Sequence, residues 1–63
     1  MKRYLISYKK NDNVLEVLAE NCIHENGHYY FENVKTKLNN VPLQVIKDDY
    51  VKSVEEIEVK AVI

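Results

Sequence analysis

The segment from residue 22 to residue 31 reads Cys22-Ile23-His24-Glu25-Asn26-Gly27-His28-Tyr29-Tyr30-Phe31. An Asn-Gly pair stands at its centre, between two apolar runs. Both residues tolerate the positive φ angles that a type I′ turn requires, so the segment predicts a tight β-hairpin. A two-residue loop also sets the cross-strand pairs, which are Glu25 with His28, His24 with Tyr29, Ile23 with Tyr30, and Cys22 with Phe31.

Side chains alternate between the two faces of a strand, so this hairpin has two different faces. One holds Cys22, His24, Tyr29 and Phe31, and the other holds Ile23, Glu25, His28 and Tyr30. Strict alternation continued from Ala19 would turn Asn21 and Ile23 inward. A bulge near Glu20–Asn21 would instead turn Cys22 and Phe31 inward. We favour the bulge because long bent strands in small barrels commonly contain one.

Upstream of the hairpin, residues 2–9 alternate with a period of two, which is typical of a strand. Tyr4, Ile6 and Tyr8 fall on one of its faces. The polar turn Asn11-Asp12-Asn13 follows. It predicts a hairpin that leads into a second strand over residues 14–20.

Downstream, a turn is expected at Asn39-Asn40, followed by a strand over residues 41–46. Pro42 cannot donate a hydrogen bond to a neighbouring strand, so this strand either starts at a sheet edge or is an edge strand. Residues 49–61 fit either a helix capped by Asp49 or a strand. The β-branched residues of 51–63 favour the strand, preceded by a short turn over residues 47–50.

Several segments in this order resemble the small SH3-like β-barrel proteins found in phages and low-GC bacteria. They are a strand, a polar turn, a strand ending at Ala19-Glu-Asn-Cys22, the aromatic strand His28-Tyr-Tyr-Phe31, then Pro42 and a closing Tyr50-Val51-Lys-Ser-Val54-Glu55. The resemblance implies an all-β barrel of about five antiparallel strands formed by residues 1–63 as one domain. A helix over 49–61 would instead resemble the PC4-like fold of four strands and a C-terminal helix, whose members dimerise and bind single-stranded nucleic acid.

Composition narrows the functional classes. The chain has 63 residues and a formal net charge of −1, whereas non-specific nucleic-acid binders are usually strongly basic. Cys22 is the only cysteine, so no disulfide can form within the chain and a reducing compartment is expected. With no signal peptide and no long apolar run in view, we expect a cytoplasmic protein that does not enter a membrane.

Self-association is expected because so short a chain has a thin core. The charge distribution adds to this expectation. Residues 1–10 carry four basic and no acidic side chains, whereas residues 48–58 carry five acidic side chains and one lysine. These segments could orient a second copy, although exposed charges contribute little energy individually.

No catalytic or metal-binding constellation is apparent. Cys22 and His24 share one face of the hairpin while His28 lies on the other, so these residues do not converge as a zinc site would. Cys22 has no oxyanion hole near it in the sequence, and Gly27 is the only glycine, which leaves no glycine-rich phosphate loop. We therefore expect no enzyme activity, no metal and no cofactor.

The aromatic residues are the main candidates for binding. Three consecutive aromatics at 29–31 exceed what one strand face can bury, so Tyr30 could anchor a partner or stack on a base, unless it only covers a neighbouring strand. The predicted binding set is Arg3, Tyr8, His28, Tyr30 and Lys35.

The expected function is that of a non-enzymatic interaction or ligand-sequestering protein. By analogy with phage proteins of this size, it would inhibit a host defence system by binding a host protein or a small nucleotide. The many Asn, Lys, Ile and Tyr residues agree with an AT-rich phage or mobile element. The alternative is a small nucleic-acid-binding module that uses Lys2, Arg3, Lys9, Lys35, Tyr8 and Tyr30.

Overall fold

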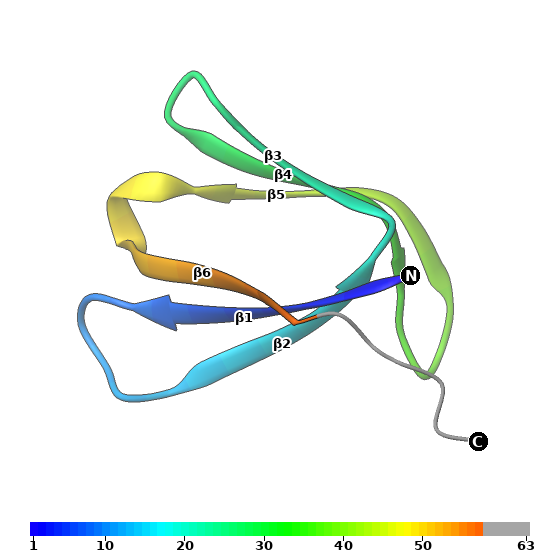
Figure 1. Cartoon of the computed structure of the whole chain (residues 1–63), viewed down its shortest axis with the longest axis horizontal. Coiled ribbons are helices and arrows are strands. Elements are labelled where there is room, and N and C mark those ends of the chain that lie inside the picture. The colour runs from blue at the N-terminus through cyan, green and yellow to red at the C-terminus, as the bar shows by residue number, and fades with distance from the viewer. Residues whose placement is uncertain (58–63) are drawn as a thin grey trace.

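A computed structural model describes residues 1–57 and shows a curled antiparallel sheet that forms a half-barrel (Figure 1). The elements are β1 (Lys2–Tyr8), β2 (Val14–Ala19), β3 (Asn21–Glu25), β4 (His28–Lys35), β5 (Asn40–Lys47), the 3₁₀ turn η1 (Asp48–Tyr50) and β6 (Val51–Ile57). The predicted all-β fold, a small barrel of antiparallel strands, is confirmed. Within residues 1–57 the strands number six and not about five, because the predicted strand that leads from 14 into the hairpin divides at Glu20.

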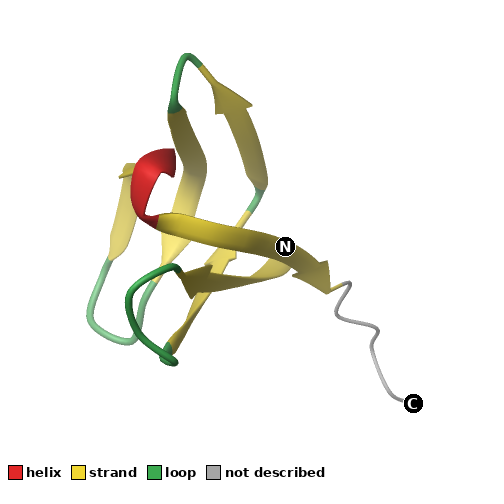
Figure 2. Ribbon diagram, turned by 90° about the vertical axis from the view of Figure 1, so that its left-hand side faces the viewer, coloured by secondary structure: helices red, strands yellow, loops and turns green. Residues whose placement is uncertain are grey.

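The sheet has two halves. In the first half, β1 lies between β2 and β6; in the second half, β4 lies between β3 and β5. The pair Leu18–Lys35 joins β2 to β4 and connects the halves. Figure 2 shows the two halves curling toward each other.

One aromatic and aliphatic core fills the space between the halves. Its buried members are Tyr4, Ile6, Val17, Ala19, Phe31, Val34 and Val51. The rings of Tyr4 and Phe31 meet edge to face, with centroids 5.5 Å apart. Tyr4 and Ile6, which alternation places on one face of the first strand, point inward, and Tyr8 packs against the same core.

The chain bends between the halves at Glu20 and Asn33. The backbone N–H of Glu20 donates to the Glu32 carbonyl at 2.9 Å. Asn33 has a φ of 52° and donates its side-chain amide to the Glu20 carboxylate at 3.0 Å. The inward placement of Cys22 and Phe31 is confirmed, because Phe31 is fully buried and Cys22 packs against the core while Ile23 is exposed.

The hairpin prediction is also confirmed. Asn26 and Gly27 have φ angles of 51° and 77°, and all four predicted pairs are formed. The turn expected at Asn39-Asn40 is displaced, because Asn40 already belongs to β5. The Thr36 backbone N–H and hydroxyl both bond to the Asn39 carbonyl, at 2.9 and 2.7 Å, and close the turn earlier. Pro42 stands in β5, which pairs with β4 alone among residues 1–57, as expected of an edge strand.

The C-terminal alternative is settled for the described residues. β6 follows η1, which takes the place of the expected turn over residues 47–50. A helix over 49–61, and with it the PC4-like arrangement, is therefore wrong: β6 pairs along β1 from Ile57 to Val51. The predicted strand residues 58–63 lie outside the described part. No helix within residues 1–57 is long and apolar enough to cross a membrane.

Candidate interaction surfaces

The outer surface of the second half of the sheet carries an exposed apolar row. Tyr30 on β4 pairs with Ile23 on β3 and with Val45 on β5, so the three side chains lie side by side on one face. Leu43 lies two residues from Val45 on the same strand. Ile23, Leu43 and Val45 are 44, 51 and 46% exposed, and Tyr30 is half-buried between its neighbours. We call Ile23, Tyr30, Leu43 and Val45 the hairpin face.

A polar row borders the hairpin face at the turn end of the hairpin. It consists of Glu25, His28 and Lys47, one from each of the three strands. The rings of His28 and Tyr30 are 6.1 Å apart, so two of the predicted binding residues do come together. At the opposite end, Glu32 pairs with Asn21 and Leu43.

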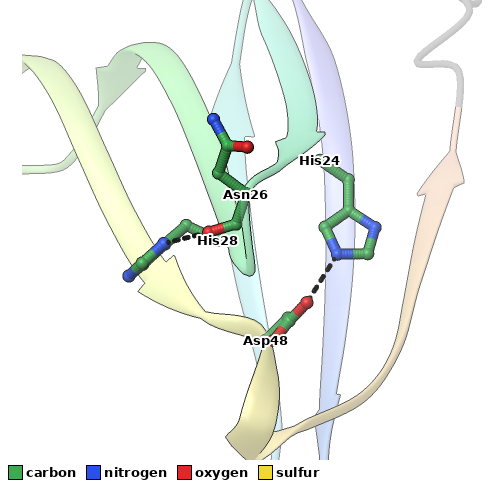
Figure 3. Close-up of polar contacts among 4 residues, drawn as sticks. All are labelled: His24, Asn26, His28 and Asp48. Carbon is green, nitrogen blue, oxygen red and sulfur yellow. Dashed lines mark hydrogen bonds and ion pairs between the residues drawn. The ribbon is translucent and has the colours of Figure 1, made fainter.

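The turn end of the hairpin is fastened to η1. His24 Nε2 lies 2.9 Å from the Asp48 carboxylate (Figure 3). The Asp48 backbone N–H also donates to the Gly27 carbonyl at 2.9 Å. The His24 ring also stacks on Tyr29, with centroids 4.0 Å apart. Sequence reasoning missed Asp48, because its partner lies 24 residues away.

The second surface is a groove beside β2. β2 pairs with β1 along its whole length, but it meets β4 only at Leu18, so residues 14–17 have no strand on their other edge within the described chain. A groove of about 650 Å³ lies along this edge. Leu15, Val17 and Val34 form its apolar lining, and Lys35 and Lys37 line the same groove.

Arg3 and Lys35 share one row of the outer surface, separated by Leu18. Arg3 Nε lies 3.4 Å from the Glu16 carboxylate, with both side chains about half exposed. Tyr8 lies elsewhere, beside a polar hollow at the turn between β1 and β2 that also contains Lys9 and Lys52. The five predicted residues therefore fall into three places: His28 with Tyr30, Arg3 with Lys35, and Tyr8 alone.

The chemistry around Cys22 does not favour a nucleophile. Burial raises the pKa of the Cys22 thiol above its usual 9.0, and the negative charge of Glu56 raises it further. The pKa of Tyr4 is raised by burial and then by Glu56 as well. Both shifts favour the protonated forms, whereas a nucleophilic cysteine needs its thiolate. No group of three or more His, Cys, Asp or Glu side chains within residues 1–57 could hold a metal ion.

Comparison of the chain with protein families, with curated proteins and with solved structures gave no match.

Proposed function

We propose that this chain is a non-enzymatic protein-binding module that takes up an extended segment of a partner along β2. The free edge of residues 14–17 carries the proposal. Such an edge presents unpaired backbone N–H and C=O groups, which another chain can use by adding a strand. The groove beside this edge leaves room for that strand, and Leu15 and Val17 offer apolar contacts to its side chains.

The charged residues that line the groove indicate which kind of partner segment it would bind. Lys35 and Lys37 line the groove, and neither forms an ion pair with the described residues. Glu16, the acidic residue that lines the groove, lies next to Arg3. The groove therefore suits an extended segment that alternates apolar and acidic residues, because alternate side chains of an added strand point to opposite faces.

An extended protein segment fits better than the other partners predicted from the sequence. The hollow beside Tyr8 is small, about 220 Å³, and neither it nor the β2 groove is enclosed, whereas a small nucleotide needs a site that buries most of its surface. A nucleic-acid site would combine the predicted basic and aromatic side chains on one surface. Arg3 and Lys35, however, lie apart from Tyr8 and Tyr30. An inhibitor of a host defence protein would act by binding an extended segment of that protein. Phage origin stays a prediction.

The test uses a capped octapeptide of alternating valine and glutamate, titrated into ¹⁵N-labelled protein. We expect amide shifts concentrated at residues 14–18 and 34–37. The double variant K35E/K37E should weaken binding about tenfold, because it reverses the charge beside the peptide. The matched control K9E/K10E changes net charge equally in the turn between β1 and β2. Neither lysine lines the groove, so the loss of affinity should be clearly smaller than in K35E/K37E.

Two results would overturn this function. One is the absence of any shift at millimolar peptide, and the other is an equal loss of affinity in both double variants. A single-stranded oligonucleotide serves as the competing ligand. Tighter binding of that oligonucleotide, with a steep salt dependence, would favour the nucleic-acid alternative instead.

A further inference from the structure

The hairpin face lies outside the groove and has no part in the proposed function. Its three exposed aliphatic side chains lie next to one another across β3 and β5, on either side of Tyr30. No other described element covers them. An apolar patch of this kind, bordered by charged residues, is typical of an interface between proteins.

We propose that the hairpin face binds the hairpin face of a second copy, in a two-fold symmetric homodimer whose axis runs along β4 in the plane of the interface. A self-complementary patch is what a two-fold interface requires, because each residue meets its symmetry counterpart or exchanges places with another. The rows of the hairpin supply this complementarity.

The polar row gives the orientation. Rotation about an axis along β4 places β3 of one subunit over β5 of the other while the turn ends stay together. Glu25 then faces the partner's Lys47, and the same contact occurs twice. Lys47 lies 3.9 Å from the Asp49 carboxylate, but both side chains are more than half exposed. So weak a pair leaves the Lys47 ammonium available to Glu25 of the other subunit.

The apolar row agrees with the same axis. Tyr30 lies on the axis and meets the partner's Tyr30, while Ile23 meets the partner's Val45. Aromatic rings at such a position can pack offset or edge to face. Ile23 and Val45 of both subunits are then covered at once, while Leu43 lies beside the partner's Asn21.

The other in-plane axis, across the strands, fits less well. It would place Lys47 against the partner's Leu43 and Glu25 against the partner's Asn21, so neither charge would meet its opposite. The favoured axis does bring Glu32 close to the partner's Glu32. That contact lies at the end of the hairpin face beside Asn33, whose φ of 52° interrupts the regular strand, and away from the two Glu25–Lys47 contacts.

Sedimentation equilibrium over a hundredfold concentration range tests the dimer against a monomer mass of 7.4 kDa. The substitution V45D places a charge at the centre of the interface and should weaken the dimer about a hundredfold. The matched control V14D changes another exposed valine, outside the hairpin face, and should leave dimerisation unchanged. Circular dichroism of each variant establishes that it is folded.

The orientation has a sharper test in E25K and K47E. Each variant alone places like charges opposite each other twice and should weaken its homodimer about tenfold. An equimolar mixture restores both opposite-charge contacts, so a mixed dimer should form with an affinity within about threefold of the wild type.

Three outcomes would overturn the proposal. They are a wild-type chain that stays monomeric at the highest concentration, a dimer that survives V45D, and E25K and K47E proteins that do not form a mixed dimer. A dimer that survives V45D but is lost on substitution in β2 would instead be an edge-to-edge assembly. None of these outcomes depends on whether the octapeptide binds the groove.

Discussion

The two halves of the sheet share one core but differ on their outer surfaces. In the first half, Leu5 is flanked by Glu16 on β2 and by Glu55 on β6, and Arg3 lies beside Glu16. In the second half, Tyr30 is flanked by Ile23 and Val45, with no charge in the row. The first surface is typical of a solvent-exposed face, and the second is typical of a protein–protein interface.

The comparison shows that apolar content alone does not identify a core. Phe31 and Tyr30 are adjacent in the sequence, yet Phe31 is fully buried and Tyr30 lies on the outer surface. The same strand thus serves the core through one face and the proposed interface through the other. Substitutions on its two faces should have different effects.

The largest effect should come from the shared core. Phe31→Ala removes a fully buried ring that contacts Tyr4, and we expect a loss of about 3–5 kcal/mol in the free energy of unfolding. Ile23→Ala, on the outer face, should cost less than about 1 kcal/mol in dilute monomer. Urea unfolding measures both. Equal losses would contradict the assignment of the two faces.

The turn of the second half should be the next most sensitive position. Gly27→Val should destabilise the fold by about 1–3 kcal/mol, because Gly27 has a φ of 77° that a β-branched residue rarely adopts. Space is not the reason, since an added Cβ would lie 3.8 Å from the Asp48 carboxylate oxygen. Asp12→Ala, in the turn of the first half, is the control, because Asp12 has no positive φ and its side chain has no hydrogen bond within residues 1–57. A melting temperature unchanged by Gly27→Val would mean that the turn is wrongly assigned.

A pH effect is expected where the halves meet at Tyr4, Cys22 and Glu56. The folded state raises the pKa of the Cys22 thiol above 9.0 and that of the Tyr4 hydroxyl above 10.0. Folding therefore favours the protonated forms, and their contribution is fully present below pH 9 and is lost as pH rises above it. Urea unfolding between pH 7 and 10.5 should show this decline.

Glu56→Gln is the matched variant for the pH effect. It removes a negative charge that raises both pKa values, so the decline above pH 9 should become smaller. Alkylation of Cys22 by iodoacetamide at pH 8 should also become faster, because more thiolate is present. An unchanged alkylation rate in a folded variant would contradict the influence of Glu56.

The smallest effect is expected on the charged surface of the first half. Glu16→Gln removes the partner of Arg3, but the pair is about half exposed, so the free energy of unfolding should change by less than about 0.5 kcal/mol. Thermal unfolding at low and moderate salt measures it. A loss above about 1 kcal/mol would show that Arg3 and Glu16 are more than a solvated pair.

The sequence by itself determined the features that depend on near neighbours. The Asn26-Gly27 turn follows from backbone sterics, and the hairpin register then follows from a two-residue loop. The grouping of Tyr4, Ile6 and Tyr8 on one face of β1 follows from alternation, and the inward placement of Phe31 follows once a bulge is placed near Glu20. The strand character of residues 51–57 follows from their β-branched side chains.

Only the tertiary structure decided what lies beside what across the barrel. The link between His24 and Asp48 joins residues 24 positions apart, and the groove exists because β2 leaves β4 after the single pair Leu18–Lys35. The predicted binding residues do not form one site for the same reason. Arg3, Tyr8 and Tyr30 are each of a residue type that suits binding, but they lie on different surfaces. Periodicity gives a side chain its face, whereas strand order and curvature give it its neighbours, and those depend on contacts distant in the sequence.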